Sequence, residues 1–125
     1  MSEDKNVIVG KYNKLFNKML NINITETTIV QSKGLITHLL KSNHHKSIKY
    51  VNCIPDIIKN PDYIGVNPNE NKDSIELVKR YENNILIGLK VDSSNNTLYV
   101  STMYDLQEQK LQRRLHSGRL IPFRK

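Results

Sequence analysis

Histidine and arginine are the residue types of this sequence best suited to chemistry, and both are unevenly placed. Three of the four histidines lie between residues 38 and 45, and four of the five arginines lie in the last thirteen residues. Histidine takes up and releases protons near neutral pH because its reference pKa is about 6.5. The planar guanidinium of arginine matches the oxygens of a phosphate group. Residues of these two types are what proton transfer at a phosphate group requires.

The charge of the chain points to a polyanionic partner. The 125 residues carry a formal net charge of +7. The segment from Asp105 to Lys125 holds six cations and two anions. Such a balance favours nucleic acid as the partner. Asn, Ile and Lys are abundant, as is typical of AT-rich coding sequence, so the arginines are better indicators of function than the lysines.

Composition excludes several classes of protein. A lone cysteine, Cys53, excludes a disulfide framework within a monomer and a cysteine-based zinc ribbon. The apolar runs are too short to span a membrane, and the first residues lack the apolar core of a secretory signal. We therefore expect a cytoplasmic protein without a membrane contact. The glycines are scattered, so no glycine-rich phosphate loop is predicted.

The spacing of apolar residues predicts mainly helices in the first half of the chain. A helix is expected over residues 6–20, followed by a short strand or a connector over 24–30. Ser32 is a suitable N-cap for a second helix. A third, short helix is expected over 50–59, with Pro55 in its first turn, where a missing N–H is tolerated.

Strands are predicted in the second half. Residues 63–66 look extended, and strands are expected over 74–81, 85–91 and 97–104. In the last of these, strict alternation puts four side chains on one face: Leu98, Val100, Thr102 and Tyr104.

Short connections favour antiparallel neighbours, and helices followed by strands indicate an α+β fold. Asp105 is expected to cap a final helix that ends at Gly118. The tail over 119–123 could form an edge strand.

A series of motifs carries a family resemblance over residues 32–123. In chain order they are HLLKSNH, IPDIIKNPDYIG, SIELVKR, ILIGLKVD, LYVSTMYD and RRLHSGRLIPF. The series resembles the phage barnase/EndoU/colicin/RelE-like nuclease domains, of the PBECR type. Two departures are a doubled histidine, His44 and His45, and a long polar loop, NPNENKD.

The resemblance implies both a fold and an activity. The implied fold has N-terminal helices packed on one face of a four-stranded antiparallel sheet, with a C-terminal helix and an active cleft on the other face. We expect an RNase-like domain over residues 32–125. Residues 1–31 would be a helical extension that either belongs to the domain or binds a partner. The implied activity is metal-independent cleavage of RNA through attack by the 2′-OH, which spares DNA.

The resemblance also suggests roles for single residues. His38 and His44 would carry protons, and Thr102 and Tyr104 would orient the substrate. Phosphate or RNA would be bound by Arg119, Lys90, Lys79 and Ser101. Each residue also has an ordinary explanation, as a helix residue, a strand former or a solvated cation.

Other cations and metals are given a smaller role. Arg113 and Arg114 are expected to contribute only bulk electrostatics or a solvated helix face. No cofactor is expected, because a zinc site built from His38, His44 and His116 would lack an obvious acidic ligand.

Three functions remain open at this point. The first is a ribonuclease toxin or a phage or mobile-element effector in the bacterial cytoplasm, with RNA and an antitoxin or host protein as partners. The second is a non-catalytic member of the same fold that binds nucleic acid or a host protein, such as a counter-defence inhibitor. The third is a structural subunit, which should expose an apolar patch over residues 7–20 and form dimers.

Overall fold

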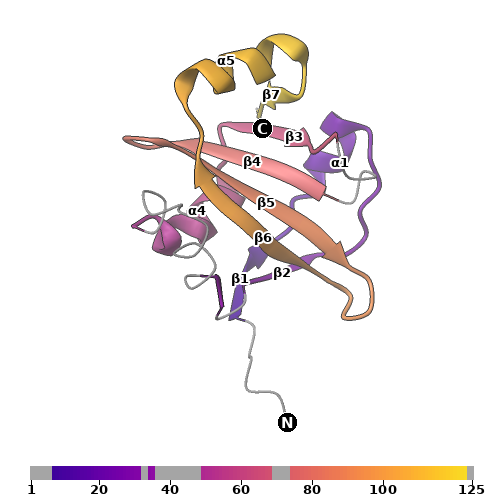
Figure 1. Cartoon of the computed structure of the whole chain (residues 1–125). Coiled ribbons are helices and arrows are strands. Elements are labelled where there is room, and N and C mark those ends of the chain that lie inside the picture. Colours follow the sequence, from indigo (N-terminus) through magenta and orange to yellow (C-terminus); the bar gives the residue numbers. More distant parts are fainter. Residues whose placement is uncertain (1–6, 32–33, 36–48, 69–73, 124–125) are drawn as a thin grey trace.

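A seven-stranded mixed sheet is the centre of the molecule (Figure 1). In the computed structural model, residues 7–31, 34–35, 49–68 and 74–123 are described. The strand order is β1-β2-β6-β5-β4-β3-β7, and neighbours are antiparallel except for the parallel pair of β2 and β6. The strands are β1 (Val7–Lys11), β2 (Thr28–Gln31), β3 (Tyr63–Val66), β4 (Ser74–Arg80), β5 (Asn84–Asp92), β6 (Thr97–Asp105) and β7 (Leu120–Pro122).

This architecture corrects the expected fold. The prediction of a four-stranded antiparallel sheet with N-terminal helices on one face is wrong, because the described chain begins with strand β1 and the sheet is wider and mixed. The helix expected over 6–20 is reduced to α1 (Leu15–Leu20). Residues Val7 to Val9 are β-branched, and such residues favour strands when a partner such as β2 is available. The second expected helix lies largely outside the described residues.

One face of the sheet carries the main hydrophobic core. Ile75 and Leu77 of β4 and Ile87 and Leu89 of β5 are fully buried there. The short helix α4 (Ile54–Lys59), preceded by the 3-10 turn η1 (Val51–Cys53), contributes Ile54, Ile57 and Ile58 to the same cluster. Pro55 occupies the first turn of α4, as predicted.

The other face is covered only in part. Helix α5 (Glu108–Ser117) inserts Leu111 into a smaller cluster, which also holds Val78, Leu86, Leu106 and Leu120. The helix begins after Gln107 rather than at Asp105, which still belongs to β6. It ends at Gly118, whose φ of 85° is a left-handed conformation that glycine adopts easily. Among the described helices, none is long and apolar enough to cross a membrane.

A β-bulge in β6 changes which side chains share a face. Gly88 pairs with Thr102, whereas the next residue, Leu89, pairs with Val100, so Ser101 is the extra residue. The Ser101 hydroxyl donates a hydrogen bond to the Gly88 carbonyl at 3.1 Å. Strict alternation was therefore the wrong expectation for this strand. Val100 points into the main core, and Thr102 points to the opposite face.

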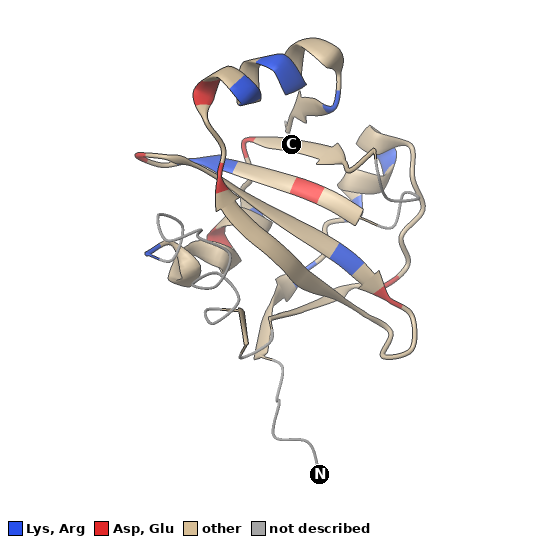
Figure 2. Cartoon of the chain, in the orientation of Figure 1, with Lys and Arg blue, Asp and Glu red and all other residues tan. Residues whose placement is uncertain are grey.

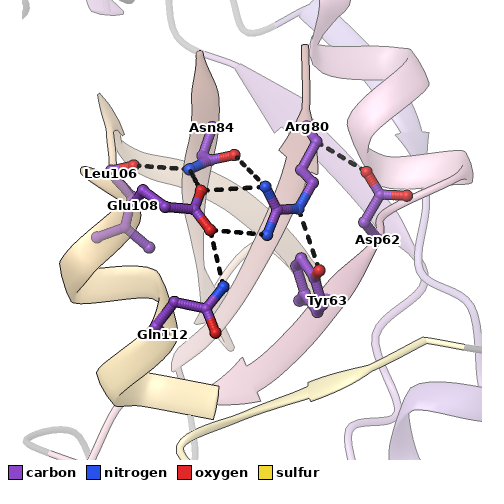
Figure 3. Close-up of polar contacts among 7 residues, drawn as sticks. All are labelled: Asp62, Tyr63, Arg80, Asn84, Leu106, Glu108 and Gln112. Carbon is purple, nitrogen blue, oxygen red and sulfur yellow. Dashed lines mark hydrogen bonds and ion pairs between the residues drawn. The ribbon is translucent and has the colours of Figure 1, made fainter. Parts of the chain in front are cut away.

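A polar network fastens the start of α5 to the turn between β4 and β5 (Figure 3). Arg80 donates two hydrogen bonds to Glu108, at 3.0 and 3.1 Å, and a third to the Tyr63 hydroxyl at 3.1 Å. Asn84 donates to Glu108 and to the Leu106 carbonyl. The hydrogen bonds that the Glu108 carboxylate accepts lower its pKa from 4.5 to about 2. The helix is thus held at its N-terminal end as well as by its apolar face.

We expect Glu108→Gln to lower the melting temperature at pH 7, because the amide cannot pair ionically with Arg80. The pKa of Glu108 is lower in the folded protein, so the stabilisation is present above pH 4.5 and is lost as the pH falls toward about 2. The difference in melting temperature between wild type and variant should therefore shrink below pH 4.5. Glu82→Gln, at an exposed ion pair with Lys49, is the control. A difference that stays constant throughout this range would contradict the assignment.

Candidate active site

A row of four residues, two of them glycines, crosses the partly open face of the sheet. Gly65 of β3, Glu76 of β4, Gly88 of β5 and Thr102 of β6 stand opposite one another in register. Paired residues of neighbouring strands point to the same face. Glu76 therefore lies between two glycines, and the place that a side chain would take at each of them is occupied by neighbouring groups.

Glu76 is buried and held by Arg119. The residue is 3% exposed, and its carboxylate accepts hydrogen bonds from Nε and Nη2 of Arg119 at 3.0 and 2.8 Å. Gly65 makes this approach possible, since a Cβ atom at that position would fall on the carbonyl oxygen of Arg119. A buried carboxylate is costly unless it is paired, and the two-pronged geometry meets that requirement.

A second guanidinium reaches the same carboxylate from α5. Nη1 of Arg114 lies 3.7 Å from Oε2 of Glu76 and donates to the Tyr104 hydroxyl at 3.3 Å. Its side chain is 19% exposed, so Arg114 is not the solvated cation that the sequence predicted. Arg113, its neighbour, is exposed on the helix.

Glu76, Tyr104 and Arg119 line a pocket of about 250 Å³. Its walls come from β3 to β6 and the approach to β7: Asn67, Ser74, Glu76, Gly88, Lys90, Ser101, Thr102, Tyr104 and Arg119. Two larger hollows, of about 510 and 460 Å³, lie beside α1 and between β1 and α4. Their described linings contain lysine but no acidic residue, so the smaller pocket offers the richer chemistry.

The pocket is electropositive. Within the described part of the chain, Arg119 and Lys90 line the pocket and Arg114 contacts Glu76, the one carboxylate of the lining. Figure 2 shows basic positions along α5 and in β5 on either side of an acidic position in β4. Hydrogen bonds to Glu76 raise the pKa of Arg119 above its ordinary value, so this guanidinium stays charged. An anion entering the pocket would meet an excess of positive charge.

The arrangement can bind a phosphate group and accept a proton. A guanidinium has five N–H donors, and the bonds to Glu76 use two of those on Arg119. A carboxylate in hydrogen-bond reach of a substrate hydroxyl is a candidate general base. Donors fixed around the position where negative charge develops stabilise a transition state.

The structure gathers most of the predicted site residues. Lys90, Ser101, Thr102, Tyr104 and Arg119 line this one pocket. Lys79 does not join them: it lies on the core side of β4, opposite Ile85, and donates to the Asn60 carbonyl at 2.8 Å.

The four histidines are not found among the described residues of the pocket. His38, His44 and His45 lie outside the described residues, so their predicted roles stay predictions. His116 is exposed on α5.

Glu76 and Arg114 were the residues that the sequence analysis missed. Glu76 stands between Ile75 and Leu77 in a strand whose other central residues are apolar, and a charge at such a position is the signal that could have drawn attention to it. Arg114 carried no comparable signal, because spacing alone does not tell which side of a helix meets the sheet.

Comparison with known proteins decides the family. Residues 6–113 match the family described as phage-Barnase-EndoU-ColicinE5/D-RelE like nuclease3. The chain belongs to this family. The resemblance noted in the motifs is thereby confirmed, and this nuclease family includes strands β1 and β2, since the match begins at residue 6. A search of curated proteins and a search of solved structures gave no match.

The two glycines beside Glu76 provide a test of how the site is built. Gly65→Ala should cost about 1–3 kcal/mol of the free energy of unfolding, because the new methyl group meets the backbone of Arg119, which cannot easily move. Gly88→Ala should cost less, since the methyl group meets only the side chains of Thr102 and Ser101. Urea denaturation of both variants measures the difference, and equal losses would contradict the close approach of the Arg119 backbone to Gly65.

Proposed function

We propose that this protein is an endoribonuclease that cleaves RNA in the pocket around Glu76. The observation that carries the proposal is the buried carboxylate of Glu76 held between the guanidinium groups of Arg119 and Arg114. Membership of a nuclease family supports phosphodiester chemistry, and the matched residues 6–113 include Glu76. RNA is the substrate that makes use of a base, because its 2′-OH can serve as the nucleophile once its proton is removed.

In the proposed reaction, Glu76 takes the proton of the 2′-OH. The 2′-oxygen bonds to the adjacent phosphorus, and the bond from phosphorus to the 5′-oxygen breaks. An acid protonates that leaving oxygen, so the products are a 2′,3′-cyclic phosphate and a 5′-hydroxyl. No metal ion is needed for this balance. The acid is the role left for the predicted proton carriers, His38 and His44.

Substrate binding would prepare Glu76 for this role. While Arg119 and Arg114 hold the carboxylate, its oxygens are engaged and are not available to a substrate hydroxyl. A phosphate that draws hydrogen bonds from Arg119 and Arg114 relieves that hold. The same two side chains would then stabilise the extra negative charge on phosphorus in the transition state.

The remaining lining residues fit supporting roles. Lys90 pairs in register with Ser74, one row away from Glu76, and can neutralise a second phosphate of the strand. The hydroxyls of Thr102 and Tyr104 stand on the same face and can hydrogen-bond the ribose or phosphate oxygens. RNA is thus the partner of this pocket, and an antitoxin or host protein would act by covering it. Such a protein would operate as a toxin or effector inside a bacterial cell.

A single cleavage experiment tests both the base and the nucleophile. Wild type and Glu76→Gln are incubated, in EDTA, with a labelled RNA and with the same strand carrying 2′-deoxy nucleotides. Wild type should cleave only the RNA and leave cyclic phosphate ends, and Glu76→Gln should cleave it about 10²–10⁴-fold more slowly. Gel electrophoresis gives the rates, and mass spectrometry identifies the ends.

Controls keep this result interpretable. Glu82→Gln makes the same charge change at an exposed position and should cleave at the wild-type rate. If Glu76→Gln melts far below wild type, Arg119→Lys replaces it, because this variant keeps the charge and loses the two-pronged contact. A folded Glu76→Gln enzyme with wild-type activity would refute the role of Glu76. Equal cleavage of the deoxy strand would refute 2′-OH attack. An inactive wild type that still binds RNA would favour the non-catalytic alternative.

The predicted histidines are tested by pH dependence. If one of them is the acid, the His38→Ala/His44→Ala double variant should lose about 10²–10⁴-fold in rate. The loss of activity toward high pH, which reports deprotonation of the acid in wild type, should also disappear from its rate profile. A double variant with the wild-type rate and profile would show that neither histidine takes part.

A further inference from the structure

A second row of side chains crosses the sheet next to the row of Glu76. Ser74 of β4 pairs with Lys90 of β5, and Lys90 pairs with Tyr99 of β6. Tyr99 is in register with Val30 of β2, which pairs with Ile8 of β1. We call these five residues the Tyr99 row. Since Lys90 lines the pocket, the whole row lies on the face that holds Glu76.

The Tyr99 row is apolar where it leaves the pocket, and it is accessible at two positions. Tyr99 is 37% exposed and Ile8 is 68% exposed, whereas Val30 between them is buried, at 7%. Val30 is absent from the main core cluster, although its neighbour Ile29 belongs to it. The exposed ring of Tyr99 thus continues the pocket onto β6, with the buried Val30 of β2 and the exposed Ile8 of β1 beyond it in the same row.

The pocket by itself is too small for a complete nucleotide. Its volume is about 250 Å³, whereas pockets that enclose a small-molecule ligand usually measure about 300–1,000 Å³. The charged groups at its base suit a phosphate and the adjoining sugar. A base attached to that sugar has to lie outside the pocket. The Tyr99 row begins at the rim of the pocket, because Lys90 belongs both to this row and to the pocket lining.

From this continuity we propose that the Tyr99 row is a stacking platform for an unpaired nucleobase next to the cleaved phosphate. The proposal rests on the proposed ribonuclease activity and adds the substrate class, which is single-stranded RNA. Nucleobases stack on aromatic side chains when they are unpaired, and this contact tolerates any base. Lys90 would hold the phosphate that connects the stacked nucleotide to the pocket. A base within a duplex cannot present its face to Tyr99.

The same exposed side chains could instead serve a protein interface. Val7, Ile8 and Leu15, which are all exposed, belong to the segment where a partner-binding subunit would show an apolar patch. Charge favours nucleic acid: the row is continuous with Lys90, Arg119 and Arg114 rather than bounded by a neutral rim. Self-association is therefore measured alongside RNA binding.

The test measures binding of a short labelled RNA analogue that has fluorine in place of each 2′-hydroxyl and cannot be cleaved. Fluorescence anisotropy gives Kd for wild type and for three variants. Tyr99→Ala should bind about five- to a hundredfold more weakly, and Tyr99→Phe, which keeps the ring, should bind like wild type. Val7→Ala is the matched control, because Val7 is exposed in the same strand as Ile8 but on the opposite face, and it should bind like wild type. With a cleavable RNA, Tyr99→Ala should raise KM more than it lowers kcat.

The outcomes separate the two proposals. If wild type cleaves RNA but Tyr99→Ala binds the analogue with unchanged Kd, the platform is refuted and the proposed activity stands. Equal binding of the analogue as a single strand and as a duplex would also refute the platform. If Tyr99→Ala alters only the oligomeric state in sedimentation, the row is a protein interface. If wild type neither cleaves nor binds RNA, both proposals fail.

Discussion

The ion pair between Glu76 and Arg119 is the interaction on which the rest of the site depends. Its partners are 43 residues apart, and it joins a central strand of the sheet to the segment that enters the edge strand β7. Burying such a pair is a poor way to gain stability, because the loss of hydration offsets much of the attraction. Its position at the base of an open, electropositive pocket gives it a different significance. In the proposed mechanism, the pair keeps the carboxylate and the guanidinium in contact until a substrate phosphate would separate them.

The fold brings a second cation to this pair through α5. The helix covers only the row of Val78 and Leu86, so the neighbouring row of Glu76 stays open while Arg114 reaches it from above. The network around Arg80 and Glu108 fixes the start of the helix by exposed hydrogen bonds, each of modest strength. The apolar contacts of Leu111 supply the stability, and the polar network determines the direction in which the helix leaves β6.

Local patterns in the sequence predicted the central part of the sheet well and its surroundings poorly. Alternation in 85–91 placed Ile85, Ile87 and Leu89 correctly in the core, and Gly118 ended α5 as expected. The bulge at Ser101 could not be read from alternation, because it depends on the hydrogen bond of Ser101 to Gly88 in the neighbouring strand. The helix predicted over β1 was wrong for a similar reason. The pairing of β1 with β2 is a tertiary contact, which the apolar spacing within β1 does not show. Local patterns predict the pairing of Glu76 with Arg119 even less, since it requires the close approach of the Arg119 backbone to Gly65.

If the two proposals hold, the two neighbouring rows on the open face divide the work of recognition. The row of Glu76 contains two glycines and holds its charges at the bottom of a small pocket, so it would bind a phosphate but not read a base. The Tyr99 row has large side chains where the first row has glycines. It draws Val30 and Ile8 from residues 1–31, which were expected either to belong to the domain or to form an extension; β1 and β2 join the same sheet and lie within the family match. If these strands form part of the substrate surface, the parallel pairing of β2 with β6 has a functional consequence: it extends the open face beyond the antiparallel strands that carry the proposed chemistry.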